Sequence, residues 1–144
     1  MSTSASPAAV AAAMWAEDNA SRGLGMRLEE TGQGRAVLSM TVTEAMVNGH
    51  GTCHGGFIFA LADTAFAFAC NWTDERTVAA QCAITYVRPA TVSMRLVAEA
   101  VEVLRHGRSG VTDVTVRDQT GAVIALFRGH SRTIGGRITT KDGG

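Results

Sequence analysis

The feature that most constrains this chain is an apolar run at residues 57–72 (FIFALADTAFAFACNW), in which Asp63 is the only carboxyl side chain. A helix that is apolar on all sides has no face for water, so this run predicts a buried helix. The run has only 16 residues, and Asp63 places a charge near its middle, so it is unlike a membrane-spanning helix. We therefore interpret the run as the central helix of a soluble core.

Asp63 needs a physical reason for its position. Removing an unpaired carboxylate from water costs several kcal/mol, so such a group is normally protonated, hydrogen-bonded or used in chemistry. One interpretation is a structural acid that nearby amides or the hydroxyl of Thr64 satisfy. The other is a catalytic carboxylate.

The 13 basic and 13 acidic residues cancel, which argues against nucleic acid or an anionic membrane surface as the main partner. A length of 144 residues predicts one domain, residues 1–144, with disordered tails at 1–5 and about 138–144. The odd number of cysteines, Cys53, Cys70 and Cys82, favours reduced thiols in a cytoplasmic protein. No basic region precedes the N-terminal alanines, so we expect no signal peptide.

The hydrophobic periodicity predicts a helix, two strands, the central helix and four further strands. The expected ranges are a helix at 8–20 and strands at 24–30, 35–42, 77–88, 92–104, 111–118 and 122–134. This order predicts an α+β domain in which an antiparallel sheet curls around one hydrophobic helix. Such a sheet covers only part of the helix, so we expect a second copy of the chain to cover the rest.

The residues around the central helix resemble a known family. Residues 46–56 (MVNGHGTCHGG), 61–67 (LADTAFA) and 69–71 (ACN) closely resemble the phenylacetic acid degradation thioesterases, the PaaI group of the hotdog-fold acyl-CoA thioesterases. Residues 88–89 (RP), 125–129 (ALFRG) and 134–136 (IGG) are also similar, and the resemblance covers about residues 14–138. The resemblance implies a hotdog fold and a homotetramer built from dimers. It also implies hydrolysis of aryl-acetyl or hydroxylated aryl-acetyl coenzyme A esters, with no metal and no cofactor apart from the coenzyme A of the substrate.

Carried over by position, the resemblance makes Asp63 the carboxylate, the Gly55 amide the carbonyl-polarising donor, and Asn48 an assisting residue. The chemistry agrees, because thioester hydrolysis needs a group that delivers water and donors aimed where charge grows on oxygen. Free amides at a helix N-terminus supply such donors, and glycine allows close approach. Asp63 can act as general base or attack the carbonyl through an anhydride. The sequence leaves both routes open.

The spacing of Gly55 and Asp63 adds a constraint. Eight residues of helix separate them by about 12 Å along the axis, at 1.5 Å per residue. Two groups so far apart cannot both touch one carbonyl. If both act on one thioester, they come from different subunits, and the active site is shared across a dimer interface.

Besides His54, five further residues are candidate substrate contacts, and each of the five has a structural alternative. Phe59 and Phe66 either flank an aromatic acyl group or pack in the core, and Thr64 either holds the water or carbonyl oxygen or is an ordinary helix hydroxyl. Gly56, like Gly55, either opens the helix N-terminus to substrate or merely allows the helix to pack tightly. Arg128, with its neighbours on the last strand, either meets the phosphates of coenzyme A or lies on a solvated or subunit-facing surface.

The loop before the central helix also has two interpretations. Asn48 and Gly49 form a strong turn pair, which competes with the catalytic role of Asn48. His50, Cys53 and His54 include metal-ligand types, but their spacing fits no standard zinc site and a fourth ligand is missing. We expect no metal, and we expect His54 to hold the loop near the substrate.

The leading hypothesis is hydrolysis of acyl-CoA thioesters, in particular aromatic ones. A lyase that hydrates or dehydrates an acyl thioester is the second, although no histidine lies in the central helix to pair with Asp63. A non-catalytic acyl-CoA binding module is the third.

Overall fold

The computed structural model describes residues 5–140, so residues 1–4 and 141–144, most of the two expected tails, lie outside the described part. Ile138 and Thr139 belong to the second expected tail, yet their backbone amides donate to the carboxylate of Asp74 at 3.1 and 2.9 Å. Burial raises the pKa of Asp74, but hydrogen bonds from Thr139, Arg137 and Ile138 outweigh burial and hold this pKa below its ordinary value. The end of the chain is thereby tied to the turn that follows the central helix.

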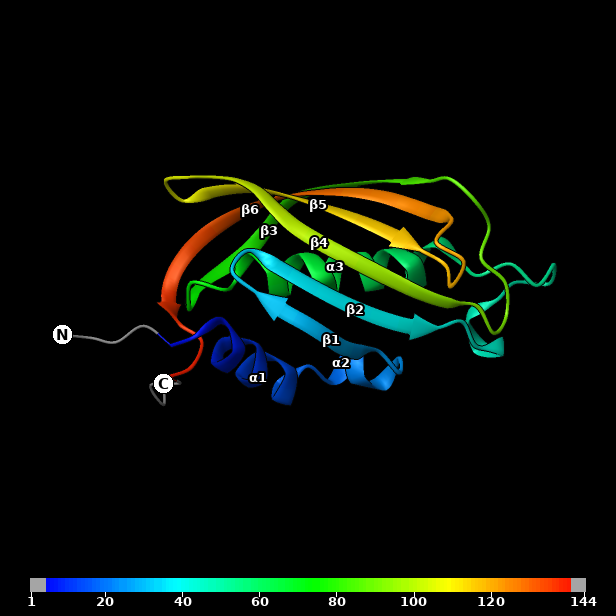
Figure 1. Ribbon diagram of the computed structural model, residues 1–144, viewed down its shortest axis with the longest axis horizontal. Coiled ribbons are helices and arrows are strands. Elements are labelled where there is room, and N and C mark those ends of the chain that lie inside the picture. The colour runs from blue at the N-terminus through cyan, green and yellow to red at the C-terminus, as the bar shows by residue number, and fades with distance from the viewer. Residues whose placement is uncertain (1–4, 141–144) are drawn as a thin grey trace.

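One six-stranded antiparallel sheet curls around one long helix (Figure 1). In chain order the elements are α1 (Pro7–Glu17), α2 (Asn19–Gly23), β1 (Arg27–Gly32), β2 (Arg35–Thr41), the 3-10 turn η1 (Glu44–Met46), α3 (Gly55–Cys70), β3 (Glu75–Tyr86), β4 (Arg95–His106), β5 (Ser109–Arg117) and β6 (Val123–Arg137). The strand order is β1-β2-β4-β5-β6-β3, and α3 packs mainly against β2, β4 and β5. The predicted α+β architecture is confirmed.

The N-terminal helix is shorter than predicted. Ser6 caps α1, because its hydroxyl accepts from the amide of Ala9 at 3.1 Å, but the helix ends at Glu17. The Asp18 carboxylate then accepts hydrogen bonds from the backbone amide and the hydroxyl of Ser21 at 2.9 and 2.7 Å, and α2 begins. Aspartate competes in this way with helix continuation, because its side chain satisfies the free amides of a new helix start.

The core forms where α3 meets the concave face of the sheet. Phe66 is only 1% exposed, and its ring lies 5.7 Å from that of Phe127 on β6. A side chain on Gly129, the second residue after Phe127, would place its Cβ 2.7 Å from the Phe66 ring, so only glycine fits there. This close approach fixes how α3 lies across β6.

One stripe of α3 is not covered by the chain itself. Gly56 is exposed, whereas Ala60, Asp63 and Ala67, which follow at helical spacing, are half-buried. Within the single chain α3 is therefore not buried on all sides. The expectation that the sheet covers only part of the helix matches the uncovered stripe.

The edge strand β3 is also open. In the strand predicted at 77–88, regular alternation places Val78, Ala80, Cys82, Ile84 and Tyr86 on one face. In the structure Val78 and Tyr86 are 44% and 48% exposed, and a register shift lies between Ala79 and Gln81. A bulge of this kind moves side chains to the other face of a strand, so the predicted alternation fails before Cys82. A long open edge is a template for pairing with another chain.

Candidate active site

The first turn of α3 offers free backbone donors. Helix α3 begins at Gly55, and the side chain of the preceding residue, His54, makes no capping hydrogen bond. Among residues 5–140, the amides of Gly55 and Gly56 have no acceptor, as expected for the first amides of a helix. The partial positive charge of the helix end adds to these two donors, so this turn can stabilise a negatively charged oxygen.

Asn48 both shapes the loop before α3 and keeps a free donor. Its side-chain oxygen accepts from the amides of His50 and Thr52 at 2.9 and 3.1 Å, which is the turn role foreseen as an alternative. Because these bonds occupy the oxygen, they also orient the amide group. Its Nδ2 has no acceptor among the described residues. The two interpretations of Asn48 are therefore compatible.

The two glycines of the first turn differ in their surroundings. A Cβ on Gly55 would lie 2.8 Å from the ring of Tyr86, whose hydroxyl donates to the Gly55 carbonyl at 2.9 Å. A Cβ on Gly56 would meet nothing within 4 Å. A side chain on Gly55 would therefore displace the half-exposed Tyr86 ring, whereas the open approach lies at Gly56. No sequence signal pointed to Tyr86.

Asp63 lies on the uncovered stripe of α3 without a partner. The carboxylate is half-buried and has no hydrogen bond or ion pair among residues 5–140. Burial raises the pKa of Asp63 above its ordinary value. The structural interpretation required nearby amides or Thr64 to satisfy this acid, and neither does so. An unpartnered acid with a raised pKa is a candidate catalytic group.

Two side chains are near the acid. Burial raises the pKa of the Cys82 thiol on β3, and the charge of Asp63 raises it further, so Cys82 lies within electrostatic reach of this carboxylate and stays protonated. Phe59, one turn before Asp63, is half-buried and meets Phe127 edge-on at 5.5 Å. The surroundings of Asp63 are therefore apolar, and the two thiols that its charge affects, Cys82 and Cys70, are neutral.

Thr64 faces α2 instead of open space. Its hydroxyl lies 2.7 Å from the carbonyl of Ala60 and 3.1 Å from the hydroxyl of Ser21, which in turn donates to Asp18. The single hydroxyl proton of Thr64 is committed to these neighbours. This arrangement supports the interpretation of Thr64 as an ordinary helix hydroxyl that joins α3 to α2.

Two predicted substrate contacts lie away from this site. Phe66 is a core residue and is closed off from solvent by β6. Arg128 follows the helix-facing Phe127, so it points to the opposite face of the sheet, where it forms a two-point ion pair with Asp113 at 2.6 and 2.8 Å. Within the single chain neither side chain reaches the uncovered stripe of α3, which fits the core alternative for Phe66 and the outer-surface alternative for Arg128.

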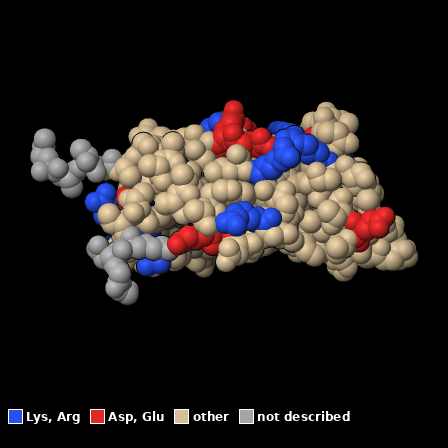
Figure 2. Space-filling model, turned by 90° about the horizontal axis from the view of Figure 1, so that it is seen from below, with Lys and Arg blue, Asp and Glu red and all other residues tan. Residues whose placement is uncertain are grey.

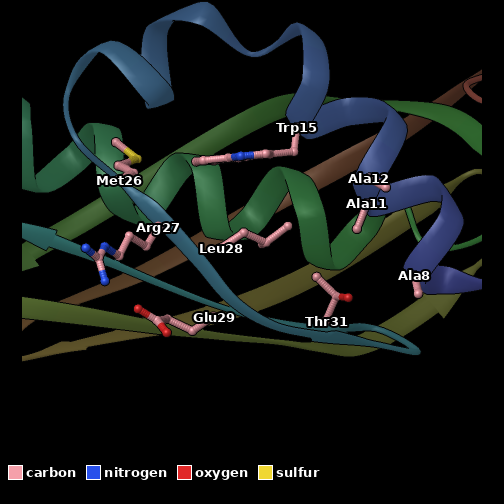
Figure 3. A pocket seen from close by; sticks show the side chains of 9 residues that line it. All are labelled: Ala8, Ala11, Ala12, Trp15, Met26, Arg27, Leu28, Glu29 and Thr31. Atoms are coloured by element: carbon pink, nitrogen blue, oxygen red, sulfur yellow. The ribbon is translucent and has the colours of Figure 1, made fainter.

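A cavity of about 540 Å³ opens elsewhere, between α1 and β1 (Figure 3). Its walls are the α1 residues Ala8, Ala11, Ala12 and Trp15 and the segment Met26, Arg27, Leu28, Glu29 and Thr31. Glu29, its only carboxylate, is held by Ser39 at 2.7 Å and Arg95 at 3.1 Å. None of the predicted site residues lines this cavity, and it offers no free acid or base.

Two further findings concern the part of the chain that the structure describes. No group of three or more His, Cys, Asp or Glu side chains lies close enough together to hold a metal ion. None of its helices is both long enough and apolar enough to cross a bilayer.

A sheet curled around one helix, with free amides at the helix start and an unpartnered acid on its open side, fits an enzyme that cleaves thioesters. Residues 50–125, more than half of the chain, match the thioesterase superfamily, so the chain belongs to this superfamily and has its hotdog fold. The predicted fold, family and enzyme class, a thioesterase, are confirmed.

Within this superfamily, the chain is clearly similar to the PaaI proteins. The chain is 45% identical over 128 residues to the acyl-coenzyme A thioesterase PaaI of Escherichia coli (strain K12), covering 88% of this chain and 91% of that relative. A structure of the E. coli PaaI protein from the phenylacetic acid degradation operon matches with a TM-score of 0.90 at 41% identity, over 91% of this chain and 95% of the other. A mutant of the phenylacetic acid degradation protein PaaI from Thermus thermophilus matches with a TM-score of 0.76 at 38% identity, over 79% and 97%. The predicted resemblance to the PaaI group is confirmed.

Proposed function

We propose that this thioesterase hydrolyses aryl-acetyl coenzyme A esters, such as phenylacetyl-CoA or its hydroxylated forms, to the free acid and coenzyme A. Asp63 takes a proton from water as the water attacks the thioester carbonyl, and the Gly55 amide stabilises the oxygen that becomes negative. Asn48 assists with its free Nδ2, and His54 and Gly56 border the approach. The observation that carries this proposal is the half-buried Asp63 carboxylate, which has no partner among the described residues.

The active site is shared between two subunits in this proposal. Asp63 and Gly55 of one chain lie about 12 Å apart along α3, too far for one carbonyl. The uncovered stripe of α3 and the open edge of β3 both call for a second copy. Figure 2 shows the molecule from below the view of Figure 1, and on that face the charged side chains form small separate groups among uncharged residues. Dimers of this kind assemble into a homotetramer in the cytoplasm, where Cys53, Cys70 and Cys82 stay reduced.

Two observations support the proposal that the acyl group of the substrate is aromatic. The E. coli relative is an acyl-coenzyme A thioesterase, and the similar structure comes from the phenylacetic acid degradation operon. In this chain the half-buried Phe59 lies one turn from Asp63 and presents an aromatic side chain near the acid. An aromatic acyl group packs favourably against such a ring.

A panel of acyl-CoA esters tests this function. We expect release of free thiol from phenylacetyl-CoA and its hydroxylated forms, detected with a thiol reagent, and slower release from aliphatic esters. Product formed with the thioester intact would indicate the hydratase or dehydratase alternative. Tight binding without turnover would indicate a binding module.

Mixing two inactive variants tests the shared site. Asp63→Asn lacks the acid, and Gly55→Pro lacks the amide donor. If each site takes one group from each chain, a heterodimer of the two variants has one intact site, and random mixing restores about a quarter of wild-type activity. Mass spectrometry of differently labelled chains confirms that the subunits have exchanged. Exchange without recovered activity would show that each site is built within one chain.

A further inference from the structure

Tyr86 joins the end of the edge strand to the start of the central helix. It is the last residue of β3, and its hydroxyl donates to the carbonyl of Gly55 at 2.9 Å. Its ring fills the space that a Cβ on Gly55 would need, with ring and hydroxyl atoms 2.8 Å from that position. The side chain is 48% exposed, so burial alone does not require the phenol to find this partner.

The acceptor of this hydrogen bond belongs to the donor group of the site. The carbonyl of Gly55 and the N–H of Gly56 are the two ends of one planar peptide unit. A hydrogen bond at the carbonyl polarises the peptide and makes its N–H a stronger donor. The Gly56 N–H has no acceptor among the described residues, and the space beside Gly56 is open. The hydrogen bond that Tyr86 donates to the Gly55 carbonyl thus strengthens the Gly56 N–H, which a substrate can reach.

We propose that Tyr86 is a positioning residue that fixes the Gly55–Gly56 peptide and strengthens the Gly56 N–H as a second donor, beside the Gly55 N–H, to the developing oxyanion. This inference rests on the proposed thioester hydrolysis. In this role Tyr86 acts through the peptide and not by contact with the acyl group or the water. Because charge on the oxygen is greatest in the transition state, loss of the hydroxyl lowers kcat and leaves KM nearly unchanged.

The variant Tyr86→Phe tests the proposal, because it keeps the ring that packs on Gly55 and removes only the hydroxyl. One hydrogen bond of ordinary strength corresponds to a fall in kcat of about 2- to 10-fold. Thr85→Val is the matched control, since it removes a hydroxyl from the neighbouring exposed residue of the same strand. We expect wild-type kcat and KM for Thr85→Val. An unchanged kcat in Tyr86→Phe, or a raised KM with unchanged kcat, would overturn the proposal.

A measurement without substrate separates this proposal from the proposed function. In protein labelled with ¹⁵N-glycine, the Gly56 amide resonance is expected to move in Tyr86→Phe and to stay in place in Thr85→Val, while the other glycine resonances confirm the fold. A Gly56 resonance that does not move would refute the role of Tyr86 even if the enzyme hydrolyses its thioester normally. A shifted resonance in a protein that hydrolyses no acyl-CoA ester would leave Tyr86 as the residue that holds this peptide and would refute the hydrolysis instead.

Discussion

Replacing Asp63 by asparagine is expected to lower kcat for thioester hydrolysis by about 10²- to 10⁴-fold, the usual contribution of a positioned acid or base. The amide has nearly the same shape but cannot accept the proton of the attacking water. The measurement is steady-state thiol release by wild type and variant. Glu75→Gln, which makes the same change at an exposed residue, is the matched control and is expected to behave as wild type.

The pH dependence of wild type gives the same residue a second test. Asp63 works as the anion, and burial raises its pKa, so kcat/KM is expected to fall with decreasing pH at a midpoint above the ordinary range of aspartate near 4. A raised pKa also means that ionising Asp63 costs stability as pH rises through that pKa. Asp63→Asn is therefore expected to unfold at the same or a higher temperature than wild type at pH 7. A large loss of thermal stability would assign Asp63 a structural role.

The second large effect is expected when the amide donor of Gly55 is removed by Gly55→Pro. Proline suits the first position of a helix, and the backbone of His54, at φ −59° and ψ 135°, suits a residue before proline. The variant therefore deletes one N–H with little change in the backbone. Loss of one oxyanion donor typically costs about 10²- to 10³-fold in kcat.

Gly55→Ala is the control for this variant. Alanine brings the same Cβ toward Tyr86 and keeps the N–H, and the half-exposed Tyr86 ring can turn away in both proteins. The ratio of kcat between the alanine and proline variants therefore isolates the donor. Equal kcat values for the two would show that the Gly55 amide does not take part in hydrolysis.

Much of the fold followed from patterns that are local in the sequence. The apolar run with Asp63 predicted the central helix, and the alternation of apolar residues after it predicted strands at 92–104, 111–118 and 122–134, close to the observed β4, β5 and β6. Predictions failed where a distant or single contact decided the outcome. Asp18 divides the N-terminal helix by capping a new one, and a bulge at Ala79–Gln81 reverses the faces of β3. Neither event changes the hydrophobic pattern enough to be detected in one sequence.

The candidate site likewise contains residues that the sequence identified and residues whose role depends on packing. Asp63, Gly55 and Asn48 were identified from residue type, spacing and resemblance, because an acid in an apolar helix and glycines at its start are unusual locally. Which side chains can reach them depends on the sheet that closes around the helix. Phe66 is enclosed by β6, Arg128 points to the outer face, and Thr64 is occupied by Ser21.

The sequence by itself determined the central helix, its acid, its glycine-rich start and the family, since these are properties of neighbouring residues. Only the tertiary structure decided that Asp63 lies on an uncovered stripe without a partner, and that Tyr86, 31 residues from Gly55 along the chain, holds the first turn of α3. The physical reason is that exposure and hydrogen-bond partners depend on how the sheet and the helix pack, and contacts between residues so far apart leave no local trace in the sequence.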